Sequence, residues 1–398
     1  MDRDNSSIAD PAPADASAAP LSINVLYVGG ALALIATVIS AVVPAFVGTW
    51  QTQYGIGADQ AAFIAAAEFF AQVVGAGVFI LAARRWSWRQ CAVGGLLIII
   101  LGNLAAAASP HVDALVPARA VAGVGGGMLR ALGMTCLARA RSPGLAFALY
   151  ATAQVAIAAI LTAMLPTIVG VAGAQTPFMA MAAIGAAAVF SARLLPNDKA
   201  VAARWNWRDA RRPRAAASFA VAALFIYFAG QGALWTFLEP IGKSQSIEQA
   251  GITRALTLLN IAGLVGSFGV GALAHKMNPV AALAALLCLG LVSVLALFNA
   301  HTSTAFIAAA CGFYFAWCAS FPFQFTIIAR ADATGTASAT VPAVDTLGLA
   351  SGAALAGMCL PRLGVTATGW AWAACSLIGF SCFVMAARTR RIGVNRCP

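Results

Sequence analysis

The stretch from Met277 to Ala329 contains no Asp, Glu, Lys or Arg, and this restricts the possible folds more than any other feature. It is too long for one membrane crossing of about 20 apolar residues, and Asn299–Ser303 divides it into two. Across the chain, 61% of residues are hydrophobic, only 9% are charged, and the mean hydropathy is +0.85. Soluble domains carry roughly 25% charged residues. The sequence therefore predicts an all-α protein that lies in a lipid bilayer.

The net charge of +11 raises the question of a nucleic-acid partner. Nucleic-acid-binding proteins gather positive charge on one face of a soluble fold. Here the basic residues lie in short clusters between apolar runs, for example at Arg84–Arg85, 204–214 and 388–391. We interpret them as topology determinants and contacts to anionic lipid, and we exclude nucleic acid as a partner.

Charges, Pro, Gly and Asn separate the apolar runs and predict twelve membrane-spanning helices. The first six are expected near 21–47, 60–83, 90–109, 113–138, 144–170 and 177–195. The second six are expected near 215–239, 253–274, 279–299, 303–329, 336–360 and 366–387. The predicted organisation is a disordered tail at 1–20, a six-helix bundle at 21–195, a central loop at 196–214, a second six-helix bundle at 215–387 and a tail at 388–398.

The distribution of Lys and Arg predicts the orientation in the membrane, because cytoplasmic loops are enriched in these residues. With a cytoplasmic N-terminus, nineteen of the 24 lie on the cytoplasmic side and three, Lys243, Arg254 and Arg362, lie outside. The other two, Arg119 and Arg130, fall inside one predicted helix. We therefore expect both termini, the central loop and both tails to be cytoplasmic, in a multi-pass protein of a bacterial inner membrane.

The two halves of the chain show a weak internal repeat. At an offset of 192 residues, Gly77 aligns with Gly269 and Arg84 with Lys276. At an offset of 191, residues 138–140 (Ala-Arg-Ala) align with residues 329–331. The repeat keeps the order of helices and loops, and parallel six-helix repeats are typical of two-bundle transporters with a site between the bundles.

Several motifs resemble the major facilitator superfamily. Residues 119–125, Arg-Ala-Val-Ala-Gly-Val-Gly, are similar to its RxxxGxG pattern in the fourth helix, and Leu195-Pro196 is similar to its LP ending of the sixth. The loop at 81–89 resembles the family's GxLADRxGRR motif, with Ala83 in place of the aspartate. The resemblance implies two pseudo-symmetric six-helix bundles and secondary transport by alternating access. No subfamily is assigned, because the fifth helix lacks the Gly-Pro motif of drug/proton antiporters and the first lacks the acids of aromatic-acid symporters.

Two arginines inside the fourth predicted helix are candidates for function, because a charge within the bilayer is costly. Arg119 is expected to bind substrate; the alternative is a structural charge pair with a neighbouring helix. Arg130 lies eleven residues later, about three turns along and on the same face. We expect a gating role for Arg130, and the alternative is that it extends towards the headgroups.

Two acids inside predicted helices are candidates for proton coupling, because a desolvated carboxylate can load and release a proton. They are Glu68 in helix 2 and Asp345 in helix 11, and the resemblance implies that these two helices face each other across the bundles. Asp345 is the better candidate, because Arg119 lies at a depth comparable to that of Glu68 and offers it a partner for a simple charge pair. For both acids the alternative is a static interhelical hydrogen bond. Gating or interface roles are expected for Gln154, Asn260, Arg130, Arg84 and Lys276.

Aromatic and amide side chains form stripes on helices 7 and 10, at spacings that place them on one face. Such stripes are also typical of ordinary packing. The resemblance implies that helices 1, 4, 7 and 10 line the cavity, so we expect Arg119, Gln231 and Phe321 to face it together and the solute to be amphipathic or anionic. The predicted substrate-binding residues are Arg119, Tyr227, Gln231, Trp235, Tyr314, Phe321 and Gln324.

The leading functional hypothesis is a secondary active transporter of a small organic solute, coupled to protons and acting as a monomer. The alternative is a non-transporting receptor or scaffold on the same fold, which would be expected to carry a sizeable soluble domain. The sequence contains no HExxH, GxSxG or GxxxxGK[ST] motif, so we do not expect an enzyme. The nine cysteines form no CxxC pair, and no metal or cofactor is expected.

Overall fold

The computed structural model describes residues 21–140, 143–197, 215–270, 277–331 and 336–394, and these residues fold into helices joined by short turns. Eleven helices are long and apolar enough to cross a membrane, or twelve if the bent pair near the N-terminus is one span. This confirms the predicted all-α membrane class. The predicted tail at 1–20 and nearly all of the central loop lie outside the described residues.

The N-terminal half supplies the first group of helices. They are α1 (Ile23–Ala41), α2 (Val43–Tyr54), α3 (Ala58–Ala82), α4 (Trp88–Ala107), α5 (Val112–Ala138), α6 (Pro143–Ala172), α7 (Thr176–Ser191) and the 3₁₀ turn η2 (Ala192–Leu194). The C-terminal half supplies the second. They are α9 (Ala215–Trp235), α10 (Leu238–Ser244), α11 (Gln249–Val265), the π-helical η3 (Gly266–Val270), α13 (Pro279–Phe298), α14 (Ser303–Ala331), α15 (Thr336–Leu363) and α16 (Thr366–Val394).

The largest differences from the predicted spans are two helix breaks. The first predicted span continues beyond residue 47 to Tyr54, but it bends by 41° between α1 and α2. Pro44 occupies the first turn of α2, where its missing N–H costs no intrahelical bond. The seventh predicted span, 215–239, instead ends at Trp235, and the short helix α10 begins at Leu238 with Pro240 in its first turn.

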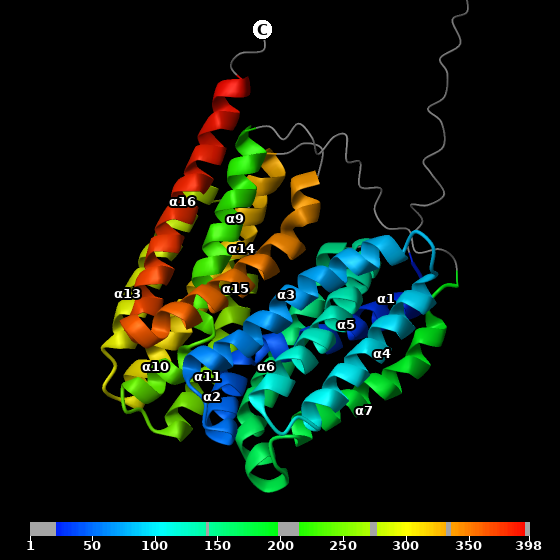
Figure 1. The fold of residues 1–398 in the computed structure, drawn as a ribbon. Helices are drawn as coiled ribbons and strands as arrows, with labels where there is room; N and C mark the ends of the chain where they lie inside the picture. Colours follow the sequence, from blue (N-terminus) through cyan, green and yellow to red (C-terminus); the bar gives the residue numbers. More distant parts are fainter. Residues whose placement is uncertain (1–20, 141–142, 198–214, 271–276, 332–335, 395–398) are drawn as a thin grey trace, which may run out of the picture.

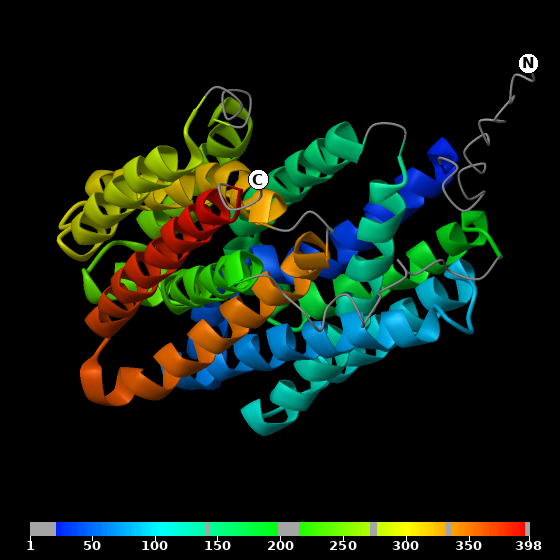
Figure 2. The same cartoon turned by 90° about the horizontal axis from the view of Figure 1, so that it is seen from above.

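The two halves lie beside one another and have the same internal plan (Figures 1 and 2). In the N-terminal half α5 is central and contacts α1, α3 and α4, and in the C-terminal half α14 contacts α9, α11 and α13. Between the halves, α3 packs on α15, α6 packs on α11, and α2 contacts α10. The halves come closest around α2, α10 and α11 and diverge towards the end that carries the C-terminus (Figure 1).

Small residues allow the close helix contacts that replace a hydrophobic driving force inside a bilayer. At the interface between α3 and α5, a Cβ added at Gly75 of α3 would overlap the Val124 backbone, and a Cβ added at Gly127 of α5 would overlap the Gln72 backbone. In the C-terminal half, a Cβ at Gly352 of α15 would overlap the carbonyl of Ala229 on α9. Large apolar side chains point outward instead, for example Leu101, Leu295 and Trp370, as a lipid-facing surface requires.

Candidate functional site

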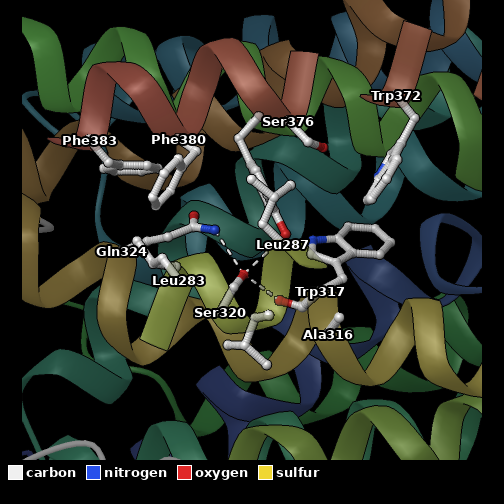
Figure 3. Close-up of a pocket in the computed structure, with 12 residues that line it drawn as sticks. Leu283, Leu287, Ala316, Trp317, Ser320, Gln324, Trp372, Ser376, Phe380 and Phe383 are labelled. Carbon is white, nitrogen blue, oxygen red and sulfur yellow. Dashed lines mark hydrogen bonds between the residues drawn. The ribbon is translucent and has the colours of Figure 1, made fainter. Parts of the chain in front are cut away.

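A small cavity lies inside the C-terminal half, between α9, α13, α14 and α16 (Figure 3). Its volume is about 20 Å³, enough for roughly one water molecule but not for an organic solute. Tyr227 and Gln324 line it and both contact the Ser320 hydroxyl, at 3.2 and 2.8 Å. Gln231 is fully buried and its Oε1 accepts a hydrogen bond from Trp372 Nε1 at 3.1 Å.

These contacts correct part of the expected substrate site. Gln231 was expected to face a cavity shared with Arg119, but its amide oxygen is hydrogen-bonded to Trp372 inside the C-terminal half. Tyr227 and Gln324 likewise point into the interior of the C-terminal half, among the described residues. All three lie at helical spacings from aromatic residues that line the cavity between the halves, so their positions along one helix do not show which side each side chain meets.

Arg119 is buried inside the N-terminal half and is 1% exposed. Its Nη2 lies 2.9 Å from Glu68 Oε1, and its Nε donates to Glu68 Oε2 at 3.2 Å. Nη1 donates to Asn103 Oδ1 at 2.9 Å, and the guanidinium lies over the Phe178 ring at 5.3 Å from the centroid. The expectation that Arg119 faces the central cavity is therefore wrong, and the alternative of a structural charge pair describes its geometry.

A larger cavity of about 260 Å³ lies between the two halves. Its lining from the N-terminal half includes Thr37, Ser40, Phe69, Gln72, Arg130 and Gln154. Its lining from the C-terminal half includes Phe228, Trp235, Asn260, Ser267, Tyr314, Trp317, Phe321, Phe325, Asp345 and Thr346. Of the predicted substrate residues, Trp235, Tyr314 and Phe321 are thus brought together, along with Asp345 and three of the predicted gating residues.

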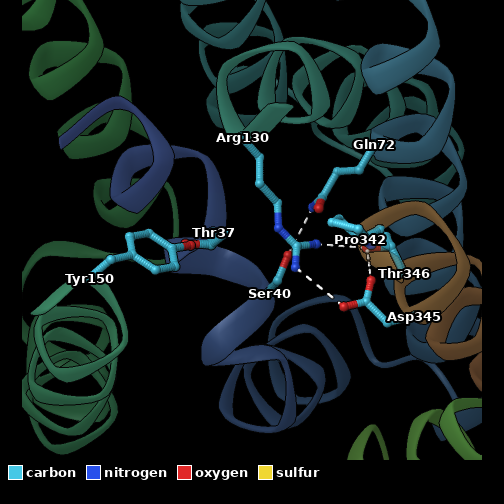
Figure 4. Close-up of polar contacts among 8 residues, drawn as sticks. All are labelled: Thr37, Ser40, Gln72, Arg130, Tyr150, Pro342, Asp345 and Thr346. Atoms are coloured by element: carbon cyan, nitrogen blue, oxygen red, sulfur yellow. Dashed lines mark hydrogen bonds and ion pairs between the residues drawn. The ribbon is translucent and has the colours of Figure 1, made fainter. Parts of the chain in front are cut away.

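An ion pair crosses the cavity from one half to the other (Figure 4). Arg130 Nη2 on α5 lies 3.6 Å from Asp345 Oδ2 on α15, and Arg130 Nη1 donates to Thr346 Oγ1 at 2.7 Å. The Thr346 hydroxyl also lies 3.0 Å from Asp345 Oδ1. The two charged side chains are 26% and 16% exposed, so the pair remains in contact with the cavity. Arg130 and Asp345 are the one cation and the one acid in the lining of this cavity, as far as the structure describes it.

Arg119 and Arg130 project from nearly the same face of α5, because eleven steps of about 100° exceed three full turns by only roughly 20°. Their partners nevertheless differ. Near Arg119, α3 and α4 supply Glu68 and Asn103, whereas near Arg130 the facing acid comes from α15. A long side chain turns to whichever opposite charge its surroundings offer, and this choice is not visible in the spacing along one helix.

Hydroxyl and amide groups near Arg130 form a polar wall, and none of the four side chains that supply them was predicted from the sequence. Gln72 Nε2 donates to Ser40 Oγ at 2.8 Å, and the hydroxyls of Thr37 and Tyr150 lie 3.1 Å apart (Figure 4). Gln72 follows Glu68 by one helical turn on α3, which is the signal that could have identified it.

The remaining predicted interface residues are divided. Gln154 and Asn260 line the cavity at the α6–α11 seam, and Asn260 Nδ2 donates to the Leu256 carbonyl at 2.7 Å. Arg84 is exposed in the turn after α3, away from the cavity lining, and Lys276 lies outside the described residues. The described part of the chain contains no group of three His, Cys, Asp or Glu that could hold a metal.

A third cavity, of about 620 Å³, lies at the opposite end, where α2 and α6 meet α10 and α11. Glu239 at its wall contacts Lys243 at 3.0 Å and accepts a hydrogen bond from Gln249 at 3.2 Å. Burial raises the pKa of Glu239, and the adjacent Lys243 opposes that shift. A Cβ at Gly48 of α2 would overlap the Glu239 carboxylate, so the glycine leaves room for Glu239 in this position.

Comparisons with known proteins agree with this architecture. The family model described as the Major Facilitator Superfamily matches residues 28–353. A solved structure described as that of "a Major Facilitator Superfamily (MFS) transporter, FucP, in the outward conformation" is similar with a TM-score of 0.63 and 17% sequence identity. The similarity covers 91% of this chain and 98% of that one, and it shows a shared fold. A search of curated protein sequences finds no match. On the family match over most of its length, the chain belongs to the Major Facilitator Superfamily and is a secondary transporter.

Proposed function

We propose that this chain is a proton-coupled secondary active transporter of a small amphipathic or anionic organic solute. It works as a monomer by alternating access, in a bacterial inner membrane with both termini cytoplasmic. The observation that carries this proposal is the ion pair between Arg130 and Asp345, which joins the two halves in the wall of the cavity they share. The receptor or scaffold alternative is not favoured by any feature of the fold.

The pair is suited to coupling because protonation changes its attraction directly. When Asp345 is ionised, it holds Arg130 of the other half in a charged contact. When Asp345 takes up a proton, that attraction is lost and the guanidinium is free to bind a solute group. A proton then has a different free energy in different arrangements of the two halves, which is the requirement for it to shift their equilibrium.

Glu68 is the weaker coupling candidate on the same geometry. Both of its carboxylate oxygens are bound by Arg119, and the two side chains are sealed within one half. A proton that entered this pair would leave an uncompensated buried arginine without altering any contact between the halves. We therefore assign Glu68 and Arg119 to holding the N-terminal half together.

The test of this proposal measures solute accumulation and binding in proteoliposomes carrying an imposed pH gradient. A library of organic solutes is screened with the wild-type protein, and the hits are repeated with Asp345→Asn. The variant should still bind and exchange solute but should not accumulate it, because Asn fixes the neutral form. Asp113→Asn, at the exposed start of α5, is the matched control and should accumulate solute normally. Full proton-driven accumulation by Asp345→Asn would overturn the assignment.

A further inference from the structure

The central cavity has two chemically different walls. The wall from the N-terminal half is polar and carries Arg130, Gln72, Gln154 and two hydroxyl groups. The wall from the C-terminal half carries six aromatic side chains beside Asp345, Thr346, Asn260 and Ser267, so a solute between the two walls would meet a cation on one side and aromatic rings on the other.

The rings of the aromatic wall pack on one another in an ordered way. The Phe228 and Phe321 rings are stacked with centroids 5.7 Å apart and planes inclined by 10°, and Phe325 continues this stack at 6.0 Å and 10°. Trp235 and Tyr314 form a second stacked pair at 5.0 Å. Stacked aromatic faces favour another planar ring over an aliphatic group of the same size, through offset or edge contacts.

Arg130 has hydrogen-bonding capacity that the protein does not fill. A guanidinium has five N–H donors and prefers two short parallel bonds to a carboxylate, at about 2.7–2.9 Å. Arg130 instead makes one bond to Thr346 through Nη1, and its Nη2 has one long contact of 3.6 Å to Asp345 in place of a short bond to a carboxylate. A second carboxylate could therefore bind this guanidinium more closely than Asp345 does.

The volume limits the size of the solute. At about 260 Å³, the cavity is slightly smaller than the ~300–1,000 Å³ typical of small-molecule pockets. A single ring with one or two short substituents fits within this volume.

We propose that the substrate is a planar aromatic monocarboxylate, with its carboxylate on Arg130 and its ring against the Phe321 and Trp235 side chains of the aromatic wall. This inference rests on the proposed function, because it takes the central cavity to be the transport site. It adds the substrate class and the charge stoichiometry.

Charge balance in the cavity gives that stoichiometry. With Asp345 ionised, Arg130 and Asp345 together carry no net charge. Binding of an aryl carboxylate adds one negative charge, and uptake of one proton by Asp345 restores neutrality: the carboxylate replaces Asp345 on Arg130, and Asp345 becomes the neutral acid. One anion therefore moves with one proton, and the cycle is electroneutral. A dicarboxylate would need a second cation, and the described lining provides none.

The first experiment is isothermal titration calorimetry of the purified protein with four compounds: benzoate, its neutral analogue benzamide, the non-aromatic cyclohexanecarboxylate and the dianion phthalate. Benzoate should bind. Benzamide should bind at least about 10-fold more weakly, because it lacks the charged hydrogen bonds to arginine. Cyclohexanecarboxylate should bind roughly 2–10-fold more weakly, because it loses the aromatic contacts. Phthalate should bind more weakly than benzoate.

Two variants assign these preferences to residues. Arg130→Gln should remove the preference for benzoate over benzamide, and Phe321→Leu should remove the preference for benzoate over cyclohexanecarboxylate. The matched controls are Arg254→Gln on the exposed face of α11 and Phe63→Leu on the outer face of α3, and both should bind as wild type. Equal affinity of the wild-type protein for benzoate and benzamide, or for benzoate and cyclohexanecarboxylate, would overturn the substrate class.

Proteoliposome assays separate this inference from the proposed function. Benzoate uptake driven by a pH gradient should be unaffected by an imposed membrane potential, after subtraction of flux in protein-free liposomes. Uptake that responds to the potential would overturn the one-to-one stoichiometry. If benzoate does not bind while another solute accumulates in an Asp345-dependent way, the substrate class fails and the proposed function stands. If benzoate binds but accumulates fully in Asp345→Asn, proton coupling through Asp345 fails and the substrate class stands.

Discussion

Helix α5 carries two arginine–carboxylate pairs that differ in almost every physical respect. The Arg119–Glu68 pair lies wholly within the N-terminal half, has two short contacts, and is 1% and 5% exposed. The Arg130–Asp345 pair joins the two halves through one contact of 3.6 Å and is 26% and 16% exposed. The same pair of functional groups can be sealed within one half or can join the two halves at a cavity, depending on where the counter-charge is located.

The energetic expectations for the two pairs follow from their burial. Removing one partner from a buried pair leaves an unpaired charge in a medium of low dielectric, which is strongly destabilising. A pair whose side chains stay partly exposed keeps part of its hydration, and its rupture costs little. The first pair is therefore expected to determine stability, and the second to determine activity.

The largest expected effect is on stability, for Glu68→Gln. This change leaves Arg119 charged and buried, and it should lower the free energy of unfolding by about 3–5 kcal/mol. Thermal unfolding of the detergent-solubilised protein measures the effect. The double change Glu68→Gln with Arg119→Leu should recover much of the loss, because it removes the unpaired charge as well. Glu248→Gln at the exposed start of α11 is the control and should leave Tm unchanged. A Tm for Glu68→Gln equal to that of the wild-type protein would contradict the structural role assigned to the Arg119–Glu68 pair.

An intermediate effect is expected for Gly127→Ala, between the two arginines on α5. An added Cβ would overlap the Gln72 backbone on α3, so the helices must separate, at a cost of about 1–3 kcal/mol. Gly126→Ala is the matched control on the next residue. Its added Cβ would meet the Ala36 carbonyl at 3.4 Å and the Gln72 side chain at 3.8 Å, which is close to ordinary contact. Thermal unfolding should give a lower Tm for Gly127→Ala than for Gly126→Ala. Equal Tm values would show that α3 and α5 pack less closely at Gly127 than its overlap with the Gln72 backbone implies.

The smallest effect on stability is expected for Asp345→Asn, although this variant should lose proton-driven accumulation. Its partner Arg130 keeps the bond to Thr346 and contact with the cavity, so unfolding should change by less than about 1 kcal/mol. The measurement is the same thermal unfolding used for Glu68→Gln. A fall in Tm as large as that of Glu68→Gln would mean that both pairs are structural, and the contrast between them would disappear.

The sequence by itself determined the membrane class, the order of the spans and the family. These depend on long apolar runs, on the positions of Lys and Arg, and on the motif that begins at Arg119, all of which act locally along the chain. It also identified Asp345 as a candidate, because an acid so far inside an apolar run is conspicuous wherever the helix packs. The α1–α2 and α9–α10 breaks occur near Pro44 and Pro240, but each lies inside or beside an apolar run that reads as one continuous span.

Only the tertiary structure decided which charged and polar groups face the central cavity. Arg119 and Arg130 lie at nearly the same helical phase. Arg119 is nevertheless bound by Glu68 and Asn103 inside one half, whereas Arg130 pairs with Asp345 in the lining of the central cavity. Gln231 was paired instead with Trp372, 141 residues away in the chain. The physical reason is that the free energy of a buried polar group depends on partners supplied by other helices, and no spacing within one helix specifies those partners.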